Sequence, residues 1–160
     1  MTTSSNILGI GDSLPPMSVN VTNNSIQNTK ELKGNWSVLY FYPKDNTPGC
    51  TTQAIGLKEN WPFFCEHNIN VIGVSKDSMD SHDKFKSKFE LPFELLSDTD
   101  LQLCNLFGVY QEKSMYGKKY MGIVRSTFII DPTLKLTHSF IKISPKPHAD
   151  KIIKAINSVM

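Results

Sequence analysis

Cysteine, charge of one sign and long apolar stretches are all scarce in this chain of 160 residues. There are three cysteines, with no C-x-x-C pair and no zinc-ligand spacing, which excludes a disulfide scaffold and a structural zinc site. A formal net charge of +2 without a long Lys/Arg run gives no reason to expect a nucleic-acid partner. No apolar stretch approaches the length of a membrane span, so we expect no membrane partner.

The start of the chain has neither the charged first segment nor the apolar run of a secretory signal. We therefore expect residues 1–6 to form a flexible tail and residues 7–160 to form a single domain. Because the cysteines are few and odd in number, a reducing compartment is expected, most simply the cytoplasm.

Along the chain, segments typical of strands alternate with segments typical of helices. A helix is expected after Cys50, with an interruption at Pro62, where proline can begin a second helical segment. The basic segment 113–119 is predicted to be a solvated loop. Further strands are predicted at 36–42, 70–75, 93–96, 127–130 and 134–141, and further helices at 81–89, 100–107 and 147–159. This order predicts a three-layer α/β fold in which helices flank a mixed central sheet.

Cys50 has the most informative surroundings of any residue in the chain. It lies in the run Pro43-Lys44-Asp45-Asn46-Thr47-Pro48-Gly49-Cys50-Thr51, between a predicted strand and a predicted helix. The free N–H groups and the positive dipole end of a helix N-terminus favour a thiolate there. The alternative is a small buried hydrophobe, as most free cysteines are. The polar, turn-forming neighbours make that alternative less favourable.

The pattern Pro43-x-x-x-Thr47-x-x-Cys50 resembles the active-site signature of the peroxiredoxins. The longer run 41–51 is similar to the bacterioferritin-comigratory protein subgroup, also called PrxQ. The similarity continues through blocks at 73–78, 81–82, 95–98, 107–109, 112–114 and 122–131, and so covers nearly the whole chain. The resemblance implies a thioredoxin-like fold and a thiol-dependent peroxidase that reduces hydrogen peroxide and organic hydroperoxides through a sulfenic acid at Cys50.

The resemblance also implies roles for the residues around the thiol. Cys50 would be the nucleophile, and Thr47 would hydrogen-bond the peroxide through its hydroxyl. Pro43 would shield the thiolate from water, and Arg125 would donate hydrogen bonds to the thiolate and the peroxide. Each of three residues also has a plainer interpretation. Thr47 could be a helix cap, a role that it could combine with binding the peroxide. Arg125 could be a solvent-facing edge residue, and Pro43 could simply end the strand.

The chain departs from its relatives in lacking the usual resolving cysteine. Ile55 stands where one version of the subgroup has it, and the segment 85–88, which matches the other version, contains no cysteine. Cys65 and Cys104 are expected to be inert packing residues, although an unwinding or an intermolecular bond could recruit Cys65. We therefore expect a one-cysteine mechanism in which thioredoxin, glutaredoxin or glutathione reduces the sulfenic acid.

The remaining residue types carry no further chemistry. The histidines are scattered without ligand spacing to acidic residues, so no metal site is predicted, and no cofactor is implied. The resemblance favours a monomer. The alternative function is a peroxide sensor or scaffold, in which oxidation of Cys50 signals to a partner instead of being reversed in turnover.

Overall fold

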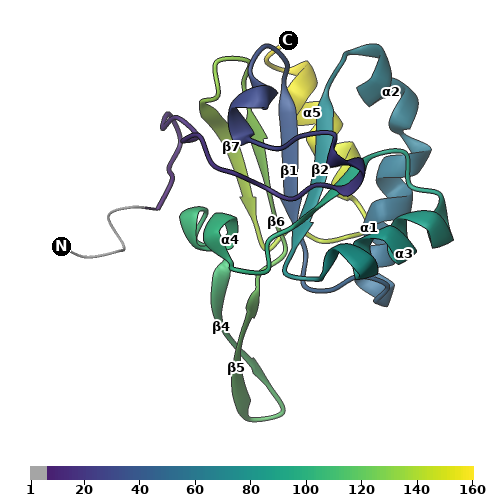
Figure 1. Cartoon of the computed structure of the whole chain (residues 1–160), viewed down its shortest axis with the longest axis vertical. Coiled ribbons are helices and arrows are strands. Elements are labelled where there is room, and N and C mark those ends of the chain that lie inside the picture. The colour runs from purple at the N-terminus through teal and green to yellow at the C-terminus, as the bar shows by residue number, and fades with distance from the viewer. Residues whose placement is uncertain (1–6) are drawn as a thin grey trace.

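The apolar run that precedes Cys50 becomes the middle strand of a five-stranded sheet in the computed structural model, which describes residues 7–160. β1 (Ser37–Phe41) pairs in parallel with β2 (Asn70–Ser75), and β2 pairs in parallel with β3 (Glu94–Ser97). β6 (Ser126–Ile130) is antiparallel to both β1 and β7 (Leu136–Ile141). The order β3-β2-β1-β6-β7 confirms the predicted mixed sheet (Figure 1). The tail predicted at 1–6 lies outside the described residues, and the single domain over 7–160 stays a prediction.

Helices cover the sheet because successive β1 side chains point to opposite faces. Val38, Tyr40 and Tyr42 belong to one apolar cluster, whereas Leu39 and Phe41 belong to a second. The first cluster is completed by α1 (Pro48–Glu59), α2 (Trp61–Glu66), α3 (Met79–Phe89) and α5 (His148–Asn157). The second contains residues of α4 (Gln102–Leu106) and of the short 3-10 turn η3 (Thr29–Leu32), together with Val21, which precedes the 3-10 turn η2 (Thr22–Asn24).

The interruption predicted at Pro62 is confirmed. α1 ends at Glu59, Asn60 lies between the two helices, and Pro62 occupies the first turn of α2, where its missing N–H is tolerated. None of the helices within residues 7–160 combines the length and hydropathy needed to cross a bilayer.

An aromatic layer forms around Tyr40 of β1, which is paired with Gly73 of the neighbouring strand β2. Tyr40 stacks on Tyr42 with ring centroids 5.5 Å apart. A Cβ added to Gly73 would lie 2.7 Å from the Tyr40 ring and 2.9 Å from the Leu95 side chain. Glycine is therefore required by this close approach, and the layer supports the face on which Cys50 packs.

The prediction of a solvated loop at 113–119 is wrong. β4 (Tyr110–Met115) and β5 (Lys118–Ile123) form a two-stranded antiparallel hairpin that projects from the body of the molecule (Figure 1). Tyr116 and Gly117 form its two-residue turn, and both have the positive φ of a type I′ turn. Most of the hairpin's side chains are exposed, so no burial pattern marks its strands in the sequence.

Candidate active site

Cys50 lies in the first turn of α1, directly after the loop that follows β1, as the sequence predicts. Thr47 occupies the N-cap position with extended backbone angles, and Pro48 begins the helix. Cys50 is 2% exposed and belongs to the first apolar cluster. The N–H groups of Gly49 and Cys50 fall in the first turn of the helix, where backbone donors have no partner within the helix. The local backbone is therefore arranged to favour an anion at the sulfur.

Arg125 approaches Cys50 from the segment between β5 and β6. Its Nη1 lies 3.4 Å from the Cys50 Sγ and donates a 2.7 Å hydrogen bond to the Oε1 of Gln53. Gln53 is fully buried one turn after Cys50, so both residues face the guanidinium from the same side of α1. A Cβ on Gly49 would lie 3.0 Å from Arg125 Nη2, so glycine leaves room for this approach. The alternative of a solvent-facing Arg125 is wrong.

Thr47 does not use its side chain as a helix cap. Its hydroxyl donates a 2.9 Å hydrogen bond to the carbonyl oxygen of Lys44, and no helix N–H is bonded to its oxygen. The hydroxyl oxygen therefore keeps lone pairs that can accept a hydrogen bond. Pro43 is half-buried at the start of the same loop, just beyond the end of β1.

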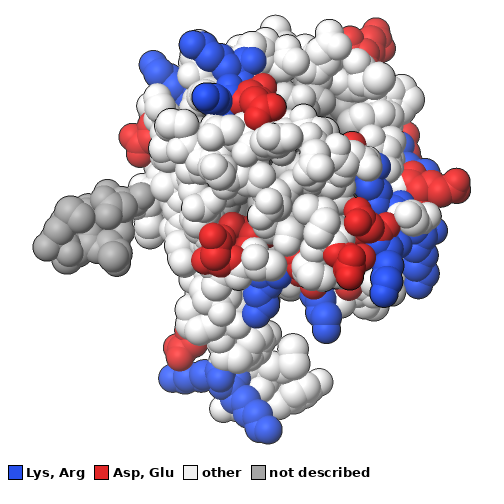
Figure 2. All heavy atoms as spheres, in the orientation of Figure 1, with Lys and Arg blue, Asp and Glu red and all other residues white. Residues whose placement is uncertain are grey.

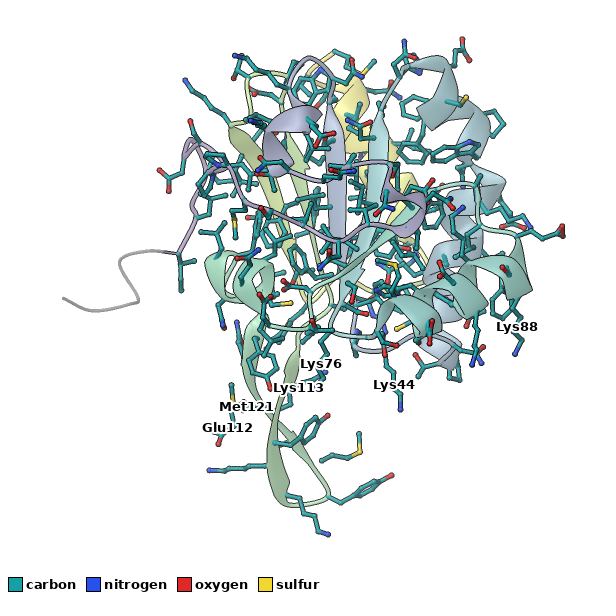
Figure 3. The ribbon with its side chains drawn as sticks, viewed as in Figure 1. Lys44, Lys76, Lys88, Glu112, Lys113 and Met121 are labelled. Carbon is teal, nitrogen blue, oxygen red and sulfur yellow. The ribbon has the colours of Figure 1, made fainter. Side chains whose placement is uncertain are left out.

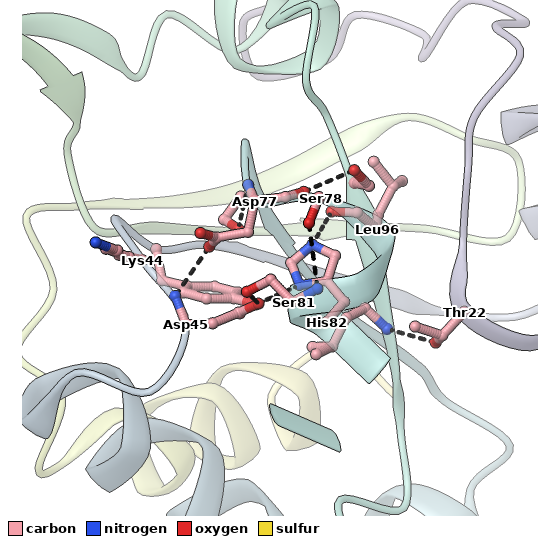
Figure 4. Close-up of polar contacts among 12 residues, drawn as sticks. Thr22, Lys44, Asp45, Asp77, Ser78, Ser81, His82 and Leu96 are labelled. Atoms are coloured by element: carbon pink, nitrogen blue, oxygen red, sulfur yellow. Dashed lines mark hydrogen bonds and ion pairs between the residues drawn. The ribbon is translucent and has the colours of Figure 1, made fainter. Parts of the chain in front are cut away.

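A buried polar network behind this loop was missed by the sequence analysis (Figure 4). The Nδ1 of His82 lies 2.8 Å from the Oδ2 of Asp45, and its Nε2 lies 3.0 Å from the carbonyl oxygen of Leu96. The carbonyl can only accept, so Nε2 carries a hydrogen. Asp45 also accepts hydrogen bonds from the hydroxyls of Tyr42, at 2.5 Å, and Ser81, at 2.8 Å. The network attaches the loop to α3 and β3.

Asp77 extends the network to the end of β2. Its Oδ2 accepts hydrogen bonds from the Asp45 N–H, at 2.9 Å, and from the Ser75 hydroxyl, at 2.6 Å. The ligand atoms of Asp45, Asp77 and His82 lie within 4.8 Å of one another, a grouping that sequence spacing did not predict. Because protein donors already surround both carboxylates, we interpret the cluster as a structural network.

His148 is a second buried histidine close to the site. Its Nε2 lies 2.7 Å from the Thr127 hydroxyl, and its Nδ1 has no hydrogen-bond partner among the described residues. Burial, followed by the positive charge of Arg125, lowers the pKa of His148 to about 3. His148 is therefore neutral near pH 7 and adds no second positive charge beside Arg125.

The other two cysteines lie away from Cys50, and all three are free thiols. Cys65 is exposed in α2, so the expectation that it packs inertly is wrong. α2 lies beyond the far end of α1, and the rise of roughly 1.5 Å per helical residue puts about 14 Å between Cys50 and that end (Figure 1). Cys104 is buried in α4 within the second apolar cluster, across the sheet from Cys50. Burial, followed by the charge of Asp98, raises the pKa of the Cys104 thiol.

Comparisons with known proteins agree with this arrangement. The model of the AhpC/TSA family matches residues 10–139. The "Peroxiredoxin Bcp" of Bacillus subtilis is 39% identical over 94% of this chain and 96% of its own, and the "Putative peroxiredoxin bcp" of Coxiella burnetii is 38% identical over 90% and 95%. A mutant PrxQ from Xylella fastidiosa superposes with a TM-score of 0.87 at 36% identity, covering 94% of this chain and 96% of that one.

The bacterioferritin comigratory protein of Xanthomonas campestris, whose structures concern alkyl peroxide reduction, has a TM-score of 0.86 at 36% identity, covering 96% of this chain and 97% of its own. These similarities extend over the sheet, the flanking helices and the loop that carries Cys50. The chain therefore belongs to the AhpC/TSA family, in its Bcp/PrxQ group of thioredoxin-fold peroxiredoxins.

Proposed function

We propose that this protein is a thiol-dependent peroxidase that reduces hydrogen peroxide and organic hydroperoxides at Cys50. The observation that carries the proposal is the position of the Arg125 guanidinium, with Nη1 3.4 Å from the Cys50 Sγ, at the first turn of α1. Helix N-terminus and guanidinium both stabilise negative charge on the sulfur, and only a thiolate attacks a peroxide efficiently.

The reaction begins when the Cys50 sulfur attacks one peroxide oxygen. A sulfur–oxygen bond forms as the O–O bond breaks, which leaves a sulfenic acid on Cys50 and releases hydroxide or alkoxide, which takes up a proton to become water or alcohol. Arg125 and the free N–H groups of Gly49 and Cys50 are the donors available to the negative charge as it moves from sulfur to oxygen. Gln53 holds the guanidinium in place through its Oε1.

Thr47 and Pro43 complete the proposed site. Because the Thr47 hydroxyl already donates its hydrogen to Lys44, its oxygen is left to accept the O–H of the bound peroxide. This hydrogen bond would orient the O–O bond towards the sulfur. Pro43 lacks an N–H and presents a half-buried apolar ring, which suits it to limit access of water to the thiolate.

The sulfenic acid is proposed to be reduced by an external thiol. Bridged cysteines have Cα atoms within about 7 Å. The length of α1 separates Cys50 from Cys65, and the sheet separates it from Cys104. We propose thioredoxin, glutaredoxin or glutathione as the reductant, a monomer as the working form and the cytoplasm as the compartment, where free thiols persist.

The alternative of a peroxide sensor is not favoured, since the relatives are named as peroxiredoxins and one set of structures concerns peroxide reduction. Steady-state peroxide consumption with a dithiol tests the proposal. Cys50→Ser should abolish turnover, whereas Cys65→Ser and Cys104→Ser should each retain most of it. Peroxide loss that stops after one turnover, or that survives Cys50→Ser, would contradict the proposal.

A further inference from the structure

A small cationic pocket shares Arg125 with the site around Cys50. Its volume is about 380 Å³, and it forms where the base of the hairpin, the start of β6 and the end of β7 meet. Its lining consists of Lys113, Val124, Arg125, Lys142 and Ile143. The pocket thus has three basic side chains, two apolar ones and no acidic one.

The positive charge of this pocket is not neutralised within the described part of the chain. Over residues 7–160, the ion pairs are His82–Asp45 and Lys86–Glu94, and neither involves a pocket residue. Glu112 is adjacent to Lys113 in β4, but successive strand residues point to opposite sides, and Figure 3 shows Glu112 and Met121 together on the other side of the hairpin. In Figure 2, basic side chains at this end of the molecule are interspersed with acidic ones.

The pocket is held in shape by its own hydrogen bonds. The Nζ of Lys113 donates to the carbonyl oxygen of Ile123 at 3.1 Å, which fixes this side chain across the base of the hairpin. The N–H of Ile143 donates to the carbonyl oxygen of Arg125 at 3.0 Å and fixes the opposite wall. Val124 and Ile143 are buried and give the pocket an apolar floor.

Arg125 connects the pocket to the thiol, because one residue both lines the pocket and places its guanidinium at the Cys50 sulfur. A ligand held by Lys113 and Lys142 would therefore also lie against the side chain that contacts Cys50. Lysine and arginine are the side chains that bind carboxylates, through charge-assisted hydrogen bonds. The volume suits one end of a small molecule and not a protein segment.

We propose that this pocket binds the carboxylate of a small anionic reactant of Cys50. Two kinds of reactant could carry this carboxylate. One is a thiol that bears a carboxylate and reduces the sulfenic acid, and the other is a hydroperoxide whose carboxylate lies at a distance from its O–O bond. The inference rests on the proposed peroxidase function and adds the class of molecule that the site selects.

For the thiol, the first step joins the reductant's sulfur to the Cys50 sulfur while the sulfur–oxygen bond breaks. The hydroxide that leaves takes the thiol's proton and departs as water. A second molecule of the thiol then attacks the reductant's sulfur in the mixed disulfide. This step returns Cys50 as a thiol and releases the reductant as its disulfide. The pocket would act on the first step by holding the thiol beside the oxidised sulfur.

Matched pairs of probes test the proposal. In one arm, glutathione is compared with its diethyl ester as the reductant of oxidised Cys50. In the other arm, a fatty-acid hydroperoxide is compared with its methyl ester as the oxidant. The variants are Lys142→Gln and Lys113→Gln, with Lys142→Arg to retain the charge. Lys33→Gln, an exposed lysine on the amino-terminal side of β1, is the matched control for loss of one charge.

In one of the two arms, the protein is expected to prefer the anionic probe over its ester. The half-saturating concentration of the anionic probe should rise about fivefold in Lys142→Gln and in Lys113→Gln, the change that corresponds to one partly exposed charge pair. The ester should be unaffected, and Lys142→Arg and Lys33→Gln should behave as the parent protein. Higher ionic strength should reduce the preference for the anionic probe. The arm that responds identifies the source of the carboxylate.

The proposal is overturned if neither arm distinguishes the acid from its ester, or if Lys33→Gln changes the preference as much as Lys142→Gln. Turnover with hydrogen peroxide and uncharged dithiothreitol separates this failure from failure of the proposed function. The lysine variants should keep that turnover, which Cys50→Ser alone should lose. A binding measurement of S-methylglutathione to the Cys50→Ser protein gives a readout independent of activity and should weaken in the same two lysine variants.

Discussion

Replacing His82 by leucine should destabilise the protein strongly, because it removes the imidazole that contacts the buried carboxylate of Asp45. His82 is 0% exposed and Asp45 is 6% exposed, and their contact is 2.8 Å. Removing one partner of a buried pair costs about 3–5 kcal/mol. The carbonyl of Leu96 also loses its 3.0 Å contact with Nε2. Domains of this size have about 5–15 kcal/mol of unfolding free energy, so the variant should lose about a fifth of it or more.

The assay is urea unfolding of a double-mutant cycle made from His82→Leu, Asp45→Leu and the double variant. If the residues stabilise each other, the double variant should lose clearly less than the sum of the two single changes, since no unpaired charge remains. His138→Leu, a partly buried histidine on β7 outside the network, serves as the control and should lose about 1 kcal/mol or less.

The reasoning is refuted if His82→Leu costs less than about 1 kcal/mol or if the two single losses simply add. The cycle also has a catalytic readout. The loop held by Asp45 carries Thr47, so the rate of reaction with peroxide should fall in His82→Leu under conditions where the protein is still folded.

Other perturbations address the remaining parts of the structure. Arg125→Ala should slow the reaction with peroxide by about 10²–10³-fold, the usual loss for one donor at developing charge, as measured by stopped-flow kinetics; an unchanged rate would remove Arg125 from the site. The pKa of His148 is about 3 in the folded protein and about 6.5 in the unfolded chain. The unfolding free energy that depends on a neutral His148 is therefore fully present above pH 6.5 and is lost as the pH falls towards 3. Denaturant titrations should therefore show about 3 kcal/mol of stability lost between pH 7 and pH 4 that His148→Gln does not show, and equal losses would be contrary evidence. Cys65 is exposed and Cys104 is buried with a raised pKa, so native alkylation followed by mass spectrometry should label Cys65 before Cys104; the reverse order of these two would contradict the structure. Gly73→Ala should destabilise by about 1–3 kcal/mol in thermal unfolding through its clash with the Tyr40 layer, and a neutral effect would disprove that clash.

The sequence predicts those parts of the structure whose determinants are contiguous. The apolar strand, the proline-rich turn and the helix around Cys50 follow one another in the chain, so local rules place the thiol at a helix N-terminus. The mixed sheet with flanking helices was predicted from the order of strands and helices along the chain, whereas the strand order was not. Gln53 could also have been identified, because residues three apart in a helix share a face, and its amide is then directed to the same side as Cys50.

The remaining features depend on contacts between distant segments. Asp45 and His82 are 37 residues apart and meet only after β1 and β2 have paired in parallel, so no spacing in the sequence reveals them. The hairpin at 110–123 was missed because its strands are exposed on both faces and show no alternation of apolar and polar residues. Cys65 was misjudged because a short helix between apolar neighbours does not reveal which side faces solvent.

The most direct measurement is the location of the sulfenic acid after the reduced protein meets an equimolar amount of hydrogen peroxide. Trapping with dimedone followed by mass spectrometry should find the adduct on Cys50, with Cys65 and Cys104 still free thiols and no disulfide between chains. An adduct on Cys65, or a Cys50 that stays unmodified while peroxide is consumed, would contradict the assignment of this sulfur as the reacting atom.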